Sequence, residues 1–355
     1  MSDIPNALRV AGGGLLAAGV LAAGAAAGAA IERAIVTRAS KPDDDWQLEP
    51  IDAEVRELTM SDGTMIHVEI DAPEEPSDLT VIFCHGYALS LDSWTFQRRA
   101  LLGRARIVSY DQRSHGSSGR GEFDSHHVDQ LGSDLAEIID AVAPTGPLIL
   151  IGHSMGGMTI MALAEQRPAL FTERIFGVAL VSTTAGGLSQ SPLGLPAPLG
   201  RAVMRAAPVV ASTLARQKDA VERGRRSSTD LSLLITRLYS FGSAASDQAG
   251  RFVARMIDAT PIDVLAEFLP ALQEHDKRHV LPLLQHAEVL VIVGDADRLT
   301  PLAHSEQIVA AIPGAEFVVI PNGGHMAMIE FHERVDALLI GFVDRVRRNL
   351  ATGAA

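Results

Sequence analysis

After residue 80, the hydrophobic pattern of the chain alternates between two kinds of segment. Short continuous apolar runs, typical of strands buried on both faces, are followed by longer segments whose apolar residues recur at helical spacing. This alternation predicts an α/β fold with a mostly parallel sheet and helices on both faces. The predicted strands are residues 81–84, 107–110, 148–151, 177–181, 289–293 and 317–320, and the predicted helices are residues 94–102, 128–141, 155–165, 303–311 and 332–348.

Three departures from the alternation divide the chain. Residues 1–40 are rich in alanine and glycine and form a separate N-terminal segment. A hairpin is predicted around Ser61-Asp62-Gly63, upstream of the alternating part. Residues 185–285 are helical or loop in pattern throughout, which predicts an inserted unit. The core of the fold is therefore assigned to residues 41–184 and 286–355.

One short motif gives the first indication of chemistry. The apolar run at residues 148–151 leads into Gly152-His153-Ser154-Met155-Gly156, and a helix-compatible segment follows at once. This is the G-x-S-x-G pattern in its required context of strand, sharp turn and helix. The serine must adopt a strained backbone conformation there, and side chains two residues away would collide with neighbouring elements, so glycine is needed at both places. The motif predicts Ser154 as a nucleophile.

Polar residues that a nucleophilic serine needs follow three other predicted strands. The run at 288–293 is followed by two candidate acids, Asp295 and Asp297. The run at 317–320 is followed by His325, and the run at 79–84 by His85-Gly86-Tyr87, where we expect the histidine to fix the turn by hydrogen bonds. A serine hydroxyl is a poor nucleophile unless a base and a group that orients the base lie beside it. The sequence therefore predicts that these segments meet at one rim of the sheet.

The order of serine, aspartate and histidine along the chain resembles that of the α/β-hydrolase family. The resemblance covers about residues 50–348 and includes the turn Asp111–Ser118, which looks like the family's D-x-R-x-H-G-x-S loop. It implies an α/β-hydrolase fold in which the insertion at residues 185–285 is a helical cap over the serine. The family pattern G-x-x-D-x-x-x-P selects Asp297 over Asp295 as the acid. The motifs are most similar to those of the esterase, lipase and haloperoxidase-like group.

The resemblance also implies a role for each candidate residue. Ser154 would be the nucleophile, His325 the general base and then the general acid, and Asp297 the residue that orients the imidazole. The backbone N–H groups of Met155 and Tyr87 would stabilise the oxyanion of the tetrahedral intermediate. Because the Tyr87 donor is a main-chain atom, the tyrosine side chain is not itself required for it.

We therefore expect a serine hydrolase that cleaves a small-molecule acyl ester, with an apolar acyl chain, through an acyl-enzyme on Ser154. The resemblance implies no metal and no organic cofactor. Haloperoxidase-type perhydrolysis without a cofactor, thioester or amide hydrolysis, and C–C bond hydrolysis remain open because they use the same residues. Two alternatives are not enzymes: a protein that uses this fold to bind a ligand without catalysis, and a membrane-tethered scaffold.

Composition excludes other classes of function. The formal net charge of −13 and the 5% content of aromatic residues disfavour nucleic acid as a partner. A single cysteine excludes an intramolecular disulfide. His275 and His279 have the spacing of zinc ligands on a helix, but Asp276 stands where the H-E-x-x-H motif has glutamate, and no third ligand is evident. We predict no metal site.

Two segments suggest contact with a membrane. Residues 10–31 carry no charge and would span about 33 Å as a helix, enough to cross a bilayer. A single membrane anchor is favoured here, and a secretory signal or a soluble tail is the alternative. Basic residues after the segment favour a cytoplasmic catalytic domain. Residues 201–226 carry seven Lys or Arg against two acidic residues, which is typical of a solvated helix face or of a lid that touches anionic headgroups. The expected localisation is membrane-associated.

Overall fold

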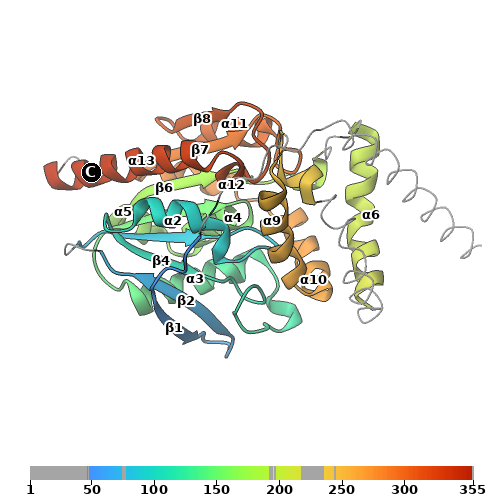
Figure 1. Ribbon diagram of the computed structural model, residues 1–355, viewed down its shortest axis with the longest axis horizontal. Coiled ribbons are helices and arrows are strands. Elements are labelled where there is room, and N and C mark those ends of the chain that lie inside the picture. Colours follow the sequence, from blue (N-terminus) through green and yellow to red (C-terminus); the bar gives the residue numbers. More distant parts are fainter. Residues whose placement is uncertain are drawn as a thin grey trace, which may run out of the picture.

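A single mixed sheet forms the centre of the molecule (Figure 1). The computed structural model describes residues 46, 48–73, 77–191, 195, 197–216, 236–243 and 245–353. Within these residues the sheet has eight strands in the order β1-β2-β4-β3-β5-β6-β7-β8. The pairs β1–β2 and β2–β4 are antiparallel, and the other pairs are parallel. The strands are β1 Glu54–Thr59, β2 Met65–Asp71, β3 Thr80–Cys84, β4 Arg106–Tyr110, β5 Leu148–His153, β6 Ile175–Val181, β7 Glu288–Gly294 and β8 Glu316–Ile320.

Helices cover both faces of the sheet. They are α2 Thr95–Leu101, α3 Val128–Val142, α4 Met155–Gln166, α5 Pro168–Glu173, α6 Ala197–Ala215, α9 Asp247–Ala259, α10 Ile262–Glu274, α11 Leu302–Ala311, α12 Ala327–Glu330 and α13 His332–Thr352. The 3₁₀ segments among the described residues are η1 Leu91–Trp94, η2 Phe123–Ser125, η3 Leu188–Gln190 and η4 Arg278–His286. The fold class predicted from the sequence, an α/β-hydrolase fold with a mostly parallel sheet, is confirmed. The predicted helix 94–102 corresponds to α2, and the short η1 segment directly precedes it.

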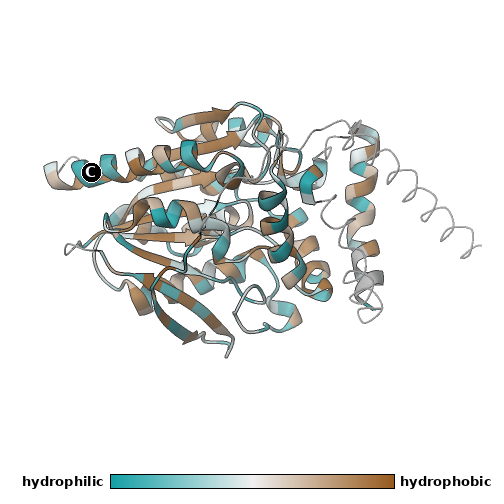
Figure 2. Ribbon diagram, viewed as in Figure 1, coloured by the Kyte–Doolittle hydropathy of each residue, from teal (hydrophilic) through white to brown (hydrophobic). Residues whose placement is uncertain are grey.

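In the described residues, the core has two large apolar layers, one on each face of the sheet, and a smaller third cluster that joins α3 and α4 to α10. Along β3 and β5, alternate side chains enter opposite layers: Ile82 and Leu150 pack on the side of α3, whereas Val81 and Ile149 pack on the side of α13. Because both faces are buried, the central strands have continuous apolar sequences rather than alternating ones. Figure 2 shows these strands coloured as hydrophobic along most of their length.

The described residues between β6 and β7 form η3, α6, α9, α10 and η4 and include no strand. In Figure 1, α6, α9 and α10 lie beside one another at one end of the sheet, and α6 and α10 are in contact. The 3₁₀ segment η4 is different, because its Val280, Leu281 and Leu284 pack into the apolar layer that contains α3. The chain has therefore returned to the core before β7 begins.

The predicted membrane localisation is wrong. No helix in the described part of the chain is both long and apolar enough to cross a bilayer. The long helix α6 contains Arg201, Arg205 and Pro208, and α13 carries acidic and basic residues along its length. Residues 10–31, from which an anchor, a signal or a tail was predicted, lie outside the described residues, as do residues 217–226 of the basic segment. The described residues give no support for membrane contact through residues 201–216.

Candidate active site

The turn between β5 and α4 holds Ser154 in a strained conformation. The serine has φ 52° and ψ −116°, a region that residues with a side chain rarely occupy. Its N–H donates to the carbonyl of Val181 at 3.0 Å, so the strain is held by the neighbouring strand. A Cβ on Gly156 would lie 2.1 Å from the carbonyl oxygen of Cys84, and one on Gly152 would lie 2.6 Å from the backbone of Gly156. Both glycines are therefore required by close backbone approach, as the motif predicts.

A buried carboxylate holds the candidate histidine. Asp297 lies in the loop after β7, and its Oδ2 is 2.9 Å from Nδ1 of His325, which follows β8. The backbone N–H groups of Leu299 and Thr300 donate to Oδ1, each at 2.9 Å, and the Thr300 hydroxyl donates to Oδ2 at 2.8 Å. Burial alone would raise the pKa of Asp297, but the charge of His325 and the hydrogen bonds from His325 and Thr300 outweigh burial and lower this pKa. The carboxylate is thus kept ionised and facing the imidazole.

The other candidate acid points away from this pair. Asp295 is exposed, and its Oδ1 accepts a hydrogen bond from the backbone N–H of Asn322 at 2.6 Å. Asp297, by contrast, is only 5% exposed and contacts His325 directly. The structure therefore pairs His325 with Asp297, the acid that the family spacing selects.

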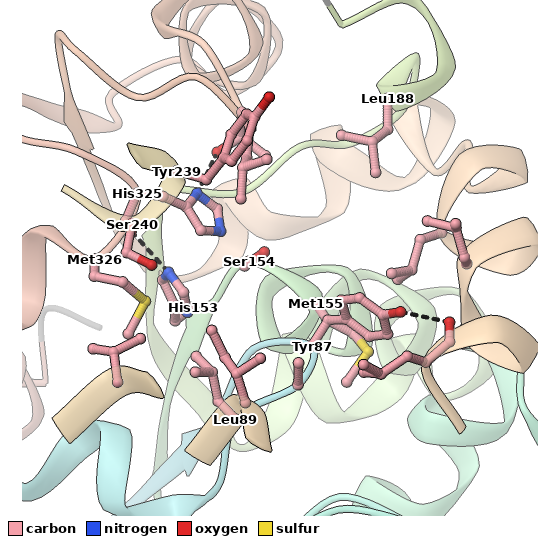
Figure 3. A pocket seen from close by; sticks show the side chains of 18 of the residues that line it. Tyr87, Leu89, His153, Ser154, Met155, Leu188, Tyr239, Ser240, His325 and Met326 are labelled. Carbon is pink, nitrogen blue, oxygen red and sulfur yellow. Dashed lines mark hydrogen bonds between the residues drawn. The ribbon is translucent and has the colours of Figure 1, made fainter. Parts of the chain in front are cut away.

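Ser154 and His325 line the same cavity, which has a volume of about 520 Å³. In Figure 3, the hydroxyl of Ser154 and the ring of His325 both face this space. Ser154 lies between β5 and α4, whereas His325 follows β8. His153, beside the serine, is fully buried, and its Nε2–H donates to the carbonyl of His325 at 2.9 Å. Burial and repulsion from His325 lower the pKa of His153 to about 3, so it is neutral and has a structural role.

The walls of the cavity are mainly apolar. The described lining residues are Tyr87, Ala88, Leu89, His153, Ser154, Met155, Met158, Leu188, Met204, Thr236, Tyr239, Ser240, Val253, Ile257, Leu265, Leu269, Leu272, Leu299, Thr300, His325 and Met326. Aspartate, glutamate, lysine and arginine are absent from this set. The volume of the cavity lies in the range of pockets that bind small molecules.

The two residues predicted to stabilise an oxyanion both line this cavity beside Ser154. Met155 is the first residue of α4, and N–H groups in the first turn of a helix have no acceptor within the helix. Tyr87 follows the turn His85-Gly86 at the end of β3. Its hydroxyl donates to the carbonyl of Leu265 in α10 at 2.5 Å, a contact that links this turn to α10.

Sequence reasoning missed the side chains that support these residues. Thr300 bonds both members of the Asp297–His325 pair, with its hydroxyl 3.3 Å from Nδ1 of His325. The hydroxyl of Thr183, after β6, donates to the carbonyl of Ser154 at 2.6 Å. Thr300 lies within the G-x-x-D-x-x-x-P spacing and could have been noticed there, whereas no local signal marks Thr183.

The histidines with zinc-like spacing are apart from this site. His279 is exposed and lies 2.7 Å from a carboxylate oxygen of Glu165, and Asp276 is paired with Arg278. Across the described ranges, no group of three or more histidine, cysteine, aspartate or glutamate residues is arranged to hold a metal ion.

Three fully buried histidines predict acid sensitivity. Burial lowers the pKa of His85 to about 4 and those of His115 and His153 to about 3. Between pH 6.5 and these values the unfolded chain binds protons that the folded protein does not, so the stability of the folded state falls as the pH falls. We expect the free energy of unfolding in urea to fall by up to about 1.4 kcal/mol per pH unit for each such histidine.

His115 provides the control for this prediction. Its Nδ1–H donates to the carbonyl of Arg113 at 2.9 Å, a bond that the amide of His115→Asn can imitate without a titratable group. The variant should take up about one proton fewer on unfolding. A stability that does not change with pH between about 6.5 and 4 in the wild-type protein would contradict the expectation.

Fold and site together define the class of protein. A strained serine after a central parallel strand, a histidine held by a buried acid on neighbouring strand ends, and a shared apolar cavity are the arrangement of an enzyme built on the α/β-hydrolase fold. A family model described as "alpha/beta hydrolase fold" matches residues 80–331. The chain belongs to the alpha/beta hydrolase family, and the prediction of a hydrolase is confirmed.

Individual relatives agree with this family. The chain is 27% identical over 292 residues to 3-oxoadipate enol-lactonase 1 of Acinetobacter baylyi, which covers 82% of this chain and 97% of that protein. It is 25% identical over 292 residues to a non-heme haloperoxidase of Rhodococcus erythropolis, which covers 81% and 98%. Among solved structures, a thermophilic esterase from Thermogutta terrifontis superimposes with a TM-score of 0.63 at 23% identity, covering 83% of this chain and 99% of that one. The chain spans only 63% and 62% of the length of two longer curated relatives that it also matches.

Proposed function

We propose that the protein is a serine esterase that hydrolyses uncharged esters with an apolar acyl chain through an acyl-enzyme on Ser154. The observation that carries the proposal is that the Asp297–His325 pair and the strained Ser154 line one apolar cavity. The esterase and enol-lactonase relatives support a hydrolase that acts on small-molecule esters.

In the first half of the reaction, His325 takes the proton of the Ser154 hydroxyl as the oxygen attacks the ester carbonyl. Asp297 accepts the Nδ1–H of His325 and stabilises the imidazolium that forms. The tetrahedral intermediate then collapses, its C–O bond to the alcohol breaks, and His325 returns the proton to the leaving alkoxide oxygen. The acyl group is left on Ser154.

In the second half, His325 removes a proton from water, which attacks the acyl carbon. Collapse of the second intermediate breaks the bond to the serine oxygen, which takes the proton back from His325. The acid product leaves, and no cofactor takes part. In both intermediates the N–H groups of Tyr87 and Met155 would donate to the oxyanion. One such donor stabilises the transition state by about 3 kcal/mol.

We assign the insertion at residues 185–285 as a cap that supplies about half of the described lining of the pocket. Its contribution to the described lining consists of Leu188, Met204, Thr236, Tyr239, Ser240, Val253, Ile257, Leu265, Leu269 and Leu272. Most of these side chains are apolar, so they favour an aliphatic or aromatic acyl group over a polar one. A carboxylate on the acyl chain would meet no basic partner among the described lining residues, and burying it unpaired is costly.

The pocket predicts a preference for longer, uncharged acyl chains. Each methylene buried against the cap contributes about 0.8 kcal/mol, so kcat/KM should rise by about fourfold per methylene until the cavity is full. The measurement is hydrolysis of p-nitrophenyl acetate, butyrate, hexanoate and octanoate at equal concentration. The adipate monoester, which is matched in length to hexanoate but carries a carboxylate too far away to attack its own ester readily, should be hydrolysed much more slowly. A flat series, or a preference for the adipate monoester, would contradict the pocket assignment.

A fluorophosphonate probe tests the mechanism. The probe phosphonylates a serine that a neighbouring base has activated, so the wild-type protein should be labelled at Ser154 and Ser154→Ala should not. His325→Gln should be labelled far more slowly, because it removes the base but keeps the serine. A folded wild-type protein that resists labelling would instead favour a ligand-binding protein without catalysis.

A further inference from the structure

Behind the turn that carries Tyr87 lies a buried amide side chain that the mechanism above does not use. Gln112 follows β4 in the D-Q-R-S-H-G turn and is 1% exposed. Its Nε2–H donates to the carbonyl of His85, and its Oε1 accepts from the hydroxyl of Thr159 with the two oxygens 2.9 Å apart. Both partners are fully buried. One side chain therefore joins the end of β3 to helix α4.

The backbone of Gln112 also determines the tautomer of His85. The Gln112 N–H donates to Nε2 of His85 at 2.8 Å, and a backbone N–H can only donate. Nδ1 of His85 must then carry the ring proton, which it donates to the carbonyl of Gly86 at 2.7 Å. Burial lowers the pKa of His85 to about 4, so the ring stays in this neutral form at neutral pH.

These bonds fix the direction of the Tyr87 N–H. The carbonyl of Gly86 and the N–H of Tyr87 belong to one planar trans peptide group and point in opposite directions. Holding the Gly86 oxygen with His85 therefore also sets where the Tyr87 N–H points. The preceding peptide is held in the same way, because the carbonyl of His85 accepts from Gln112.

The same side chain reaches the other predicted oxyanion donor. Thr159 lies one turn after Met155 in α4, and its hydroxyl is also 2.9 Å from the carbonyl of Met155. The single hydroxyl hydrogen is shared between this carbonyl and Oε1 of Gln112. Gln112 is thus bonded to the segments that present both N–H groups.

We infer that Gln112 is a positioning residue that aligns the Tyr87 and Met155 N–H groups with each other. The inference rests on the proposed function, since it concerns the oxyanion site of that reaction. Glutamine suits the position because one end must donate to a carbonyl and the other must accept from a hydroxyl. Methionine has a similar length but neither group, and glutamate has the donor only when it is protonated.

The first experiment measures the loss of alignment. Gln112→Met should lower kcat for p-nitrophenyl butyrate by about 10- to 100-fold, because small displacements of catalytic groups have effects of this size, while KM changes by less than about twofold. Affinity for an alkylboronic acid, which forms a tetrahedral adduct with the serine, should fall in parallel with kcat. A role limited to folding would not weaken the tetrahedral adduct selectively.

Gln97→Met is the matched control. Gln97 is also fully buried, and its Nε2–H donates to the carbonyl of Met328 at 2.8 Å and to Asp336 at 2.6 Å. This variant should lower the melting temperature and leave kcat within about twofold of wild type. An equal loss of kcat in both variants would assign the effect of Gln112→Met to general destabilisation and overturn the inference.

The second experiment is a pH profile of Gln112→Glu. A protonated glutamic acid can donate its O–H to the carbonyl of His85 and accept from Thr159, so it replaces the amide. An ionised carboxylate has no donor and repels the carbonyl oxygen. Buried glutamates without a cationic partner can have a pKa of about 8 to 9. The ratio of variant to wild-type kcat should therefore fall as the pH rises, which adds a descending limb that the wild-type profile lacks.

Two outcomes overturn the inference. One is a Gln112→Met protein with wild-type kcat and boronic acid affinity, and the other is a Gln112→Glu ratio that does not depend on pH. Ser154→Ala is assayed in parallel to separate this failure from that of the proposed function. If Ser154→Ala is inactive and Gln112→Met is fully active, only the role of Gln112 is wrong. If Ser154→Ala keeps its activity, the mechanism itself is wrong.

Discussion

Ser154→Ala should lower kcat for p-nitrophenyl butyrate by about 10⁴- to 10⁶-fold and leave the protein folded. The substitution removes the oxygen that forms the acyl-enzyme and keeps the backbone of the turn. Alanine tolerates the φ of 52° about as well as serine does, so the fold should survive. The measurement is steady-state hydrolysis, with a thermal unfolding curve to confirm the fold.

Ser182→Ala is the matched control for this substitution. Ser182 follows β6, the strand beside β5, is fully buried and has a φ of 47°. It is not among the described residues that line the cavity. This variant should hydrolyse the ester at close to the wild-type rate. If Ser154→Ala retained more than about 1% of the wild-type kcat, another group would have to be the nucleophile.

Asp297→Asn should lower kcat by about 10⁴-fold, because the amide forces the wrong tautomer on His325. The hydrogen bonds of Asp297 determine how the amide must lie. The backbone N–H groups of Leu299 and Thr300 both donate to Oδ1, so the amide oxygen must occupy that position. The NH₂ group then stands at Oδ2 and donates to Nδ1 of His325. Nε2 then carries the ring proton and can no longer accept a proton from the serine hydroxyl.

Asp295→Asn separates this effect from a general change of charge after β7. The two substitutions each remove one negative charge, at positions two residues apart. Asp295, however, is exposed, and its Oδ1 accepts from the backbone N–H of Asn322 rather than from His325. Its variant should keep kcat within a few-fold of wild type. A reversed result, with Asp295→Asn inactive and Asp297→Asn active, would show that the acid has been assigned wrongly.

The sequence predicted those features of the site that close local geometry requires. Gly152 and Gly156 were predicted from the motif, and the structure shows that neither position has space for a Cβ. The central strands were predicted because burial on both faces makes their sequences continuously apolar. The choice of Asp297 over Asp295 came from family spacing, because both residues look alike in composition.

Contacts between distant segments were not predicted, for a physical reason. The bond from Tyr87 to Leu265 joins residues far apart in sequence, and the bonds of Gln112 join three segments that meet only in the folded sheet. No periodicity or spacing encodes such meetings. The error on localisation is of another kind: the prediction depended on the absence of charge in residues 10–31, which lie outside the described residues, whereas no described helix is long and apolar enough to cross a bilayer.

Helix α10 combines two tasks that the neighbouring helices do not share. It contributes Leu265, Leu269 and Leu272 to the pocket wall, and its Leu265 carbonyl accepts from the Tyr87 hydroxyl. Any mutation that shifts α10 to admit a bulkier substrate also pulls on the segment that binds the oxyanion. The side chains of α6 and α9, such as Met204 and Val253, border the same space without that bond. Natural or laboratory evolution of new substrate ranges on this scaffold should therefore proceed through α6 and α9, while α10 stays constant.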